Sequence, residues 1–160
     1  MEWMLLPFRR YADFRGRSRR MEFWMFQLLN VIVWFVIMAI GFSGFPWGEM
    51  MSGDAAQVEA QMQGMDGIGA GFWVAIVLAG LWGLGTFIPA LALTVRRLHD
   101  RGLSGWWYAG AIVLSLIPLV NILAFFAYIA LFVIFVLPGE RGPNKWGPDP
   151  KDPGQASVFE

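Results

Sequence analysis

The segment RRLHDRG at residues 96–102 gathers three arginines, an aspartate and the only histidine of the chain. Arginines can clamp a phosphate or a lipid headgroup, and a histidine beside them can respond to pH. His99 and Asp100 also form the one candidate acid–base pair. However, neighbouring residues point to different sides of a helix, and no nucleophile lies nearby in the sequence. Of these two chemical roles, anion binding is therefore favoured over catalysis, and we assign no catalytic residue.

The same segment also has a purely structural interpretation, in which it is the end of a helix. Arginines favour the negative end of the helix dipole, and Gly102 suits the left-handed residue that follows a helix. Arg96 and Asp100 are four residues apart, so they can pair on one helix face. This interpretation explains the spacing fully, and specific anion binding is the alternative.

A second basic segment, FRGRSRRMEFW, occupies residues 14–24. Its arginines oppose the dipole of a helix that begins here, so lipid phosphate and membrane topology explain them better than helix stability. Ser18 is a candidate N-cap. Glu22 lies just inside an apolar boundary and needs a cation, for which Arg97 and Arg101 are candidates. We expect the two basic segments to meet through Glu22.

The elements that must position these residues are long apolar segments. The chain is 57% hydrophobic and only 15% charged, whereas about 25% charged residues is usual in soluble domains. Residues 23–48, 67–95 and 102–139 contain no charged side chain, and about 20 apolar residues suffice for a spanning helix. The composition therefore predicts an all-α integral membrane protein. The predicted spans are about 23–43, 71–95, 104–117 and 121–137.

The third apolar run is too long for one span and short for two. Pro118 and Asn121 lie inside it, and proline breaks or kinks a helix. We expect a short hairpin of two spans, which gives four in total. The alternative is one long kinked helix, which gives three.

Charge placement predicts the topology, because loops rich in Lys and Arg stay cytoplasmic. Six arginines precede the first span, whereas the loop 44–70 has acidic residues and no Lys or Arg. Arg141, Lys145 and Lys151 favour a cytoplasmic C-terminus. Both termini are therefore expected inside. We expect one membrane domain over residues 1–150 and a flexible tail over 151–160.

Smaller features complete the expectations. Phe8, Tyr11 and Phe14 recur every third residue, which indicates a surface helix started by Pro7. A second short helix is expected near 54–62 in the outer loop.

Within the spans, Gln27 and Asn30 share a face and are expected to bond between helices. Gly80, Gly83 and Gly85 permit close helix contact.

The chain has no cysteine, so disulfides and thiolate sites are excluded, and one histidine leaves little for a metal site. A copper site at the loop methionines lacks any supporting His or Cys. Nucleic acid binding is not expected, because no aromatic platform accompanies the arginines. No cofactor or metal is expected. The loop methionines considered for copper are Met50, Met51, Met62 and Met65.

Four motifs resemble the bacterial domain-of-unknown-function family 805. They are FxGRxxRxEFWxF at 14–26, RRLHDRGxSGWW at 96–107, IPLVN at 117–121 and PGxxGPNKWGPDP at 138–150. The resemblance covers nearly the whole chain in the same order, although the outer loop looks long for the family. It implies a small multi-spanning inner-membrane protein and supplies no activity or catalytic residue.

The sequence therefore predicts a non-enzymatic inner-membrane protein with an Arg-rich cytoplasmic patch that binds anionic phospholipid headgroups or a partner protein. A small transporter or channel subunit acting as a homo-oligomer is the alternative, and a lipid-headgroup enzyme is the third. The residues assigned to binding are Arg17, Arg20, Arg96, Arg97 and Arg101, and those assigned to organising the patch are Glu22, His99 and Asp100.

Overall fold

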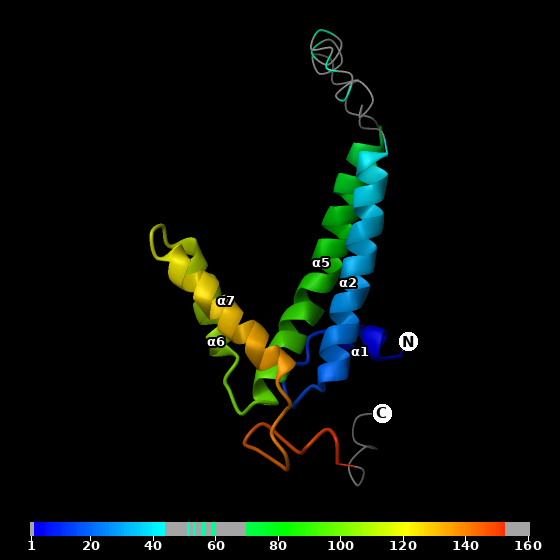
Figure 1. The fold of residues 1–160 in the computed structure, drawn as a ribbon. Coiled ribbons are helices and arrows are strands. Elements are labelled where there is room, and N and C mark those ends of the chain that lie inside the picture. The colour runs from blue at the N-terminus through cyan, green and yellow to red at the C-terminus, as the bar shows by residue number, and fades with distance from the viewer. Residues whose placement is uncertain are drawn as a thin grey trace. The chain divides into compact units, whose positions relative to one another are not determined.

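The computed structural model describes residues 2–43 and 70–152, together with residues 51, 53, 56 and 59. The named elements of this part are all helices (Figure 1), and its β pairing is an isolated bridge between Asn144 and Gly147. The predicted all-α class is confirmed. The helices are α1 Glu2–Arg9, α2 Arg20–Phe42, α5 Ala70–His99, α6 Trp106–Leu116 and α7 Asn121–Val136.

The two long helices, α2 with 23 residues and α5 with 30, are apolar and long enough to cross a membrane. Each extends beyond its predicted span at the end that carries arginines. α2 begins at Arg20 rather than at residue 23, and α5 continues to His99 rather than ending at residue 95. Arg96 and Arg97 of RRLHDRG therefore stand on the last turn of α5, and Arg101 follows the helix.

The predicted N-terminal surface helix is misplaced. α1 ends at Arg9 and holds Pro7 inside it, where the proline is buried, so the helix does not start at Pro7. The chain turns directly after α1 because Asp13 accepts hydrogen bonds from the Arg10 side chain, at 2.8 and 3.0 Å, and from the Arg15 amide, at 3.0 Å. The helix expected near 54–62 falls in a stretch most of which lies outside the described residues.

The chain divides into two compact units, and the smaller one comprises residues 29–86. In it, α2 and α5 approach closely at two glycines. A Cβ at Gly71 would lie 2.7 Å from the Ile40 carbonyl oxygen, and one at Gly41 would lie 3.1 Å from the Ala75 Cβ. At the glycines predicted for close contact, positions 80, 83 and 85, an added Cβ would have no neighbour within 4 Å. The close contacts between α2 and α5 are therefore at Gly41 and Gly71 rather than at the predicted glycines.

A polar contact also joins the same two helices. Trp82 donates its indole N–H to the Asn30 side-chain oxygen at 3.1 Å. The expectation that Asn30 bonds between helices is therefore confirmed.

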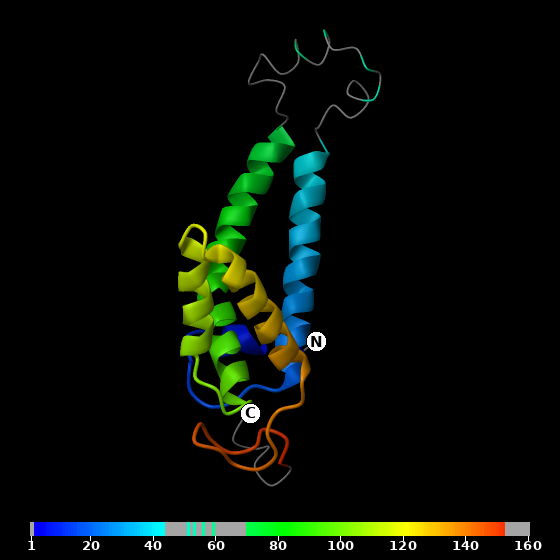
Figure 2. The same ribbon diagram turned by 60° about the vertical axis from the view of Figure 1, so that its left-hand side comes forward.

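The larger unit comprises residues 1–28 and 87–160. In it, α6 and α7 pack side by side as a hairpin (Figures 1 and 2). The break lies at residues 117–120, where Leu119 has a positive φ of 67°. The break into two helices agrees with the predicted hairpin rather than with one continuous helix, whereas the number of membrane crossings stays a prediction.

The apolar core of this unit joins the first turns of α2, the last turns of α5, and both hairpin helices. The Phe23 and Phe135 rings, from α2 and α7, have centroids 4.7 Å apart. Its buried members are Phe23, Phe26, Leu93, Leu98, Ala111, Leu131 and Phe135.

Candidate functional site

Five charged side chains are buried together where the two basic segments meet. We call them the buried ionic cluster: Arg17, Glu22, Arg96, Arg97 and Asp100, none more than 3% exposed. The segment before α2 supplies the first, the first turn of α2 the second, and the end of α5 the remaining three. All five lie in the larger unit.

Asp100 pairs with arginines from both basic segments. Its Oδ1 lies 3.0 Å from the Arg17 guanidinium, and its Oδ2 accepts from Arg97, three residues earlier on α5. The predicted pair of Arg96 with Asp100 is wrong, because Arg96 points instead to Glu22. Asp100 is therefore the junction between the segment before α2 and the end of α5.

Glu22 completes the second connection between the basic segments. Its Oε1 lies 3.1 Å from Arg96, and its Oε2 accepts the Ser18 hydroxyl at 2.7 Å. The expectation that the segments meet through Glu22 is confirmed, although the partner is Arg96 rather than Arg97 or Arg101. The Ser18 hydroxyl serves this carboxylate instead of capping α2, and the Ser18 amide donates to the Arg96 carbonyl at 3.2 Å.

Each arginine of the buried ionic cluster bonds one carboxylate and two main-chain carbonyls. Three guanidinium groups face two carboxylates, so the carbonyl dipoles offset the surplus positive charge. Arginine suits this task because its planar fork presents five donors. The carbonyls are those of Glu140 and Gly142 for Arg17, Arg10 and Asp13 for Arg96, and Phe135 and Leu137 for Arg97.

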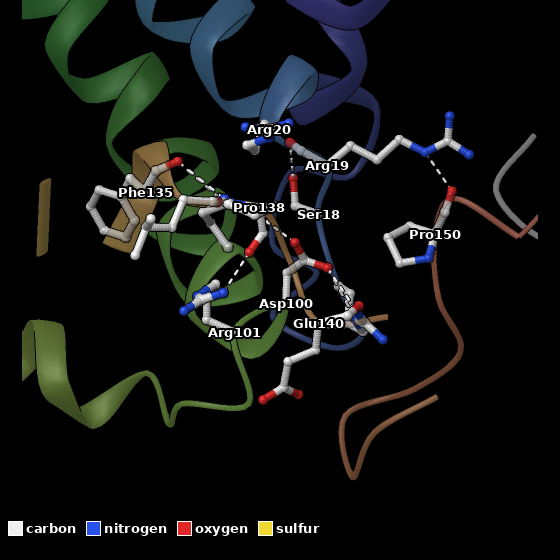
Figure 3. A network of polar contacts seen from close by, with 12 residues as sticks. Ser18, Arg19, Arg20, Asp100, Arg101, Phe135, Pro138, Glu140 and Pro150 are labelled. Carbon is white, nitrogen blue, oxygen red and sulfur yellow. Dashed lines mark hydrogen bonds and ion pairs between the residues drawn. The ribbon is translucent and has the colours of Figure 1, made fainter. Parts of the chain in front are cut away.

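Two further arginines bond main-chain carbonyls at and just beyond the C-terminal end of α7, and Figure 3 shows the contact of Arg101 with Pro138. Arg20 donates to the Val136 carbonyl at 3.3 Å, and Arg101 donates to the Pro138 carbonyl at 2.5 Å. The last carbonyls of a helix have no partner within the helix and carry its negative dipole end. Together with Arg97, these arginines satisfy that helix end, which explains why three guanidinium groups converge on it.

Residues 139–146, which follow α7, cover the buried ionic cluster, and we call them the cover segment. The Glu140 amide donates to the Asp100 carbonyl at 2.8 Å, and the Asn144 side chain donates to the His99 carbonyl at 3.0 Å. The approach depends on Gly139, because a Cβ there would overlap Asp100 Oδ2. Gly102 has the predicted left-handed φ, 67°. The four prolines between residues 143 and 153 did not predict these contacts.

Asp149 shapes the same segment by accepting two main-chain hydrogen bonds. The Gly142 amide donates to Oδ2 and the Lys151 amide to Oδ1, each at 3.0 Å. Burial alone raises the pKa of Asp149, but these bonds and the charges of Arg17 and Lys151 outweigh it, so the pKa is lowered. The carboxylate therefore stays ionised and holds the turn.

His99 is enclosed rather than presented to a substrate, and it lies beyond the apolar run that ends at residue 95. The indole of Trp146 stacks on its ring, with centroids 3.7 Å apart and planes 5° from parallel. Its Nδ1 lies 3.2 Å from the Gly16 carbonyl oxygen. The geometry favours a structural imidazole over an acid–base catalyst.

The structure divides the predicted binding residues into two classes. Arg17, Arg96 and Arg97 are at most 1% exposed and bond internal acceptors, whereas the Arg20 side chain is exposed and Arg101 is partly exposed. Headgroup binding stays a prediction for all five, and the geometry favours it only for Arg20 and Arg101. In the described part of the chain, no three His, Cys, Asp or Glu side chains group as metal ligands.

Sequence reasoning missed the residues that cover the buried ionic cluster. The segment GERGPNKW at 139–146 carried one usable signal: glycines at both ends of a charged pair, which is typical of a tight turn against another chain segment. Pairing through main-chain carbonyls leaves no signature in side-chain types. The residues concerned are Gly139, Glu140, Gly142, Asn144 and Trp146.

Comparisons with known proteins agree with the motifs. The inner membrane protein YhaH of Escherichia coli K12 is 34% identical over 151 residues, which cover 94% of this chain and 98% of YhaH. The inner membrane protein YhaI of the same strain is also 34% identical over 151 residues, with 97% of its length covered. These relatives support an inner-membrane location. No solved structure gives a significant match to the chain. A model of the family described as "Protein of unknown function (DUF805)" matches residues 11–148, so the chain belongs to the DUF805 family.

Proposed function

We propose that this protein is a non-enzymatic, multi-spanning component of the inner membrane whose cytoplasmic face binds anionic phospholipid headgroups. The observation that carries the proposal is the division of the arginines. A buried set fixes the fold of this face, and Arg20 and Arg101 remain accessible at the end of α7. Guanidinium groups bind phosphate oxygens through two parallel hydrogen bonds, which suits a lipid headgroup.

The charge distribution supports a topology with both termini in the cytoplasm. All 12 Lys and Arg residues fall within 9–20, 96–101 and 141–151, and none lies between residues 21 and 95. Under the positive-inside rule these three segments share the cytoplasmic side, with the loop 44–70 outside. An even number of crossings follows. The count of four stays a prediction.

Aromatic residues support placing Arg101 at headgroup depth. Trp106 and Trp107 begin α6 and are 81% and 65% exposed. Tryptophan is enriched at the membrane–water interface, where its ring is apolar and its N–H meets water. A guanidinium five residues before these rings lies within reach of lipid phosphate.

Native mass spectrometry of the detergent-extracted protein tests the proposal. The double variant Arg20→Gln with Arg101→Gln should lose co-purified phosphatidylglycerol and cardiolipin. The matched control, Arg141→Gln with Lys145→Gln, removes two exposed cations away from the helix ends and should retain them. Thermal unfolding of both variants shows that each is folded.

Anionic lipid bound equally by both double variants would contradict the proposal. The same spectra report the oligomeric state and any protein partner. A homo-oligomer or a co-purified membrane protein would favour the partner-binding or transporter-subunit alternatives over lipid binding alone.

A further inference from the structure

The hairpin of α6 and α7 is too short to cross a bilayer. α6 has 11 residues and α7 has 16, which at a rise of about 1.5 Å per residue gives lengths of about 17 and 24 Å. The hydrocarbon core is about 30 Å thick. By the same rule the 23 residues of α2 reach about 35 Å. The turn between the two helices, residues 117–120, adds little length because the chain reverses there.

The base of the hairpin is held in one place. Before α6, Arg101 donates to the Pro138 carbonyl at 2.5 Å, and the Asp100 carbonyl accepts from the Glu140 amide at 2.8 Å. Both ends of the hairpin therefore lie beside the buried ionic cluster, on the same side of the membrane. The remaining question is how deep the tip reaches.

The tip has the composition of a segment in hydrocarbon rather than in water. Residues 116–120 read LIPLV, and Leu116 and Leu119 are 75% and 94% exposed. The chain carries no charge anywhere between residues 102 and 139. Aromatic side chains of the interfacial kind stand at the base, with Trp106 and Trp107, and none stands at the tip. A turn that emerged on the far side would place two exposed leucines in water.

The turn also limits the polar backbone that it presents. Pro118 has no N–H, and the Ile117 amide donates to the Leu114 carbonyl at 3.4 Å. The Asn121 amide donates to the Ile117 carbonyl at 3.1 Å, and the Leu123 amide to that of Val120 at 2.8 Å. Internal pairing of these groups lowers the free energy of placing the turn in hydrocarbon.

We propose that α6 and α7 form a re-entrant hairpin, which enters the bilayer from the cytoplasmic side and ends among the acyl chains. The proposal rests on the membrane topology proposed above and replaces four crossings by two, made by α2 and α5. A tip about 17–24 Å from the base stops short of the far side of a core about 30 Å thick. The occupant of the apolar tip surface is lipid.

Single-cysteine variants test the depth of the tip, because the parent chain has no cysteine. Leu119→Cys is placed at the tip, Ser52→Cys in the outer loop and Lys145→Cys in the C-terminal segment. A membrane-impermeant maleimide is applied to whole spheroplasts and to inverted membrane vesicles. The re-entrant hairpin predicts that the cysteine at 119 reacts no faster than the cysteine-free parent from either side.

The two control positions separate failure of the hairpin proposal from failure of the topology. Position 52 should react only in spheroplasts and position 145 only in inverted vesicles. If either control reacts from the opposite side, the topology is wrong. If both controls behave as expected and position 119 reacts in spheroplasts, the hairpin crosses the membrane and the re-entrant proposal is overturned.

A spin label at position 119 distinguishes lipid from protein as the occupant. In vesicles of phosphatidylethanolamine and phosphatidylglycerol, a tip among acyl chains is accessible to oxygen and inaccessible to a water-soluble nickel chelate. Low accessibility to both reagents would mean that protein, such as a second copy of the chain, covers the tip, and it would overturn the assignment of lipid.

Discussion

The two units of this protein hold their helices together by different physical means. In residues 29–86, α2 and α5 meet through small residues at Gly41 and Gly71 and through one hydrogen bond between Asn30 and Trp82. In the larger unit, the ends of α2, α5 and α7 are joined by the buried ionic cluster. Both units pack apolar side chains, but among the described residues only the larger one adds buried ion pairs to that packing.

This difference shows which contacts determine how the helices align with one another. A shift of the neutral pair by a turn would lose the close contacts at Gly41 and Gly71. A shift that separates a buried charge from its partner costs more, because an unpaired charge away from water costs several kcal/mol. Asp100 can be satisfied only where Arg17 and Arg97 are both in reach. We infer that the buried ionic cluster sets the register of the helix ends in the larger unit.

The largest expected effect comes from Asp100→Asn. This variant keeps the side-chain shape but removes the negative charge between Arg17 and Arg97, so two buried guanidinium groups lose their counter-charge. We expect a loss of about 3–5 kcal/mol in the free energy of unfolding. Thermal unfolding of the detergent-solubilised protein, followed by tryptophan fluorescence, measures it.

The matched control for that prediction is Asp13→Asn. Asp13 also pairs with an arginine, Arg10 at 2.8 Å, but the two side chains are 39% and 22% exposed. Its pair should contribute no more than about 1 kcal/mol. Equal losses in the two variants would show that burial gives the ionic cluster no special weight.

A smaller loss is expected from Gly139→Ala. The new methyl group would overlap Asp100 Oδ2, so the cover segment or the aspartate must move. Overpacking of this kind costs about 1–3 kcal/mol. The same unfolding assay applies, with Gly110→Ala on α6 as the control, because a Cβ there meets nothing within 4 Å. If Gly139→Ala leaves the free energy of unfolding unchanged, the cover segment does not pack tightly against the buried ionic cluster.

The smallest effect is expected in the smaller unit, from Asn30→Leu. This change removes the acceptor of the Trp82 indole N–H while preserving an apolar surface. Hydrogen bonds between helices in membranes contribute about 0.6 kcal/mol on average and rarely more than about 1.7. An effect as large as that of Asp100→Asn would invalidate the contrast between the two units. Unfolding measured in the same detergent makes the values comparable.

The helices were predictable because hydrocarbon imposes a strong rule on sequence. Runs without charge gave the positions of α2, α5, α6 and α7 to within a few residues, and Pro118 marked the break between the last two. The ends were less predictable. Arg20, Arg96 and Arg97 belong to helices, although a rule based on apolar runs stops before them.

The buried ionic cluster was predictable in part. The need of Glu22 for a cation correctly brought the two basic segments together, because a carboxylate at an apolar boundary has few alternatives. The choice between Arg96, Arg97 and Arg101 was not available from spacing, since all three stand within six residues at the end of α5. The position of each side chain around the helix axis decides which arginine reaches Glu22. The sequence also assigned Arg17, Arg96 and Arg97 to the surface, because arginine is seldom buried.

The cover segment has a consequence for biosynthesis. Arg17 emerges from the ribosome long before two of its acceptors, the carbonyls of Glu140 and Gly142, which lie 123 and 125 residues later in the chain. Until those residues arrive, the donors of Arg17 bond water instead of these carbonyls. The packing of Arg17 is therefore completed only after α7 has been made.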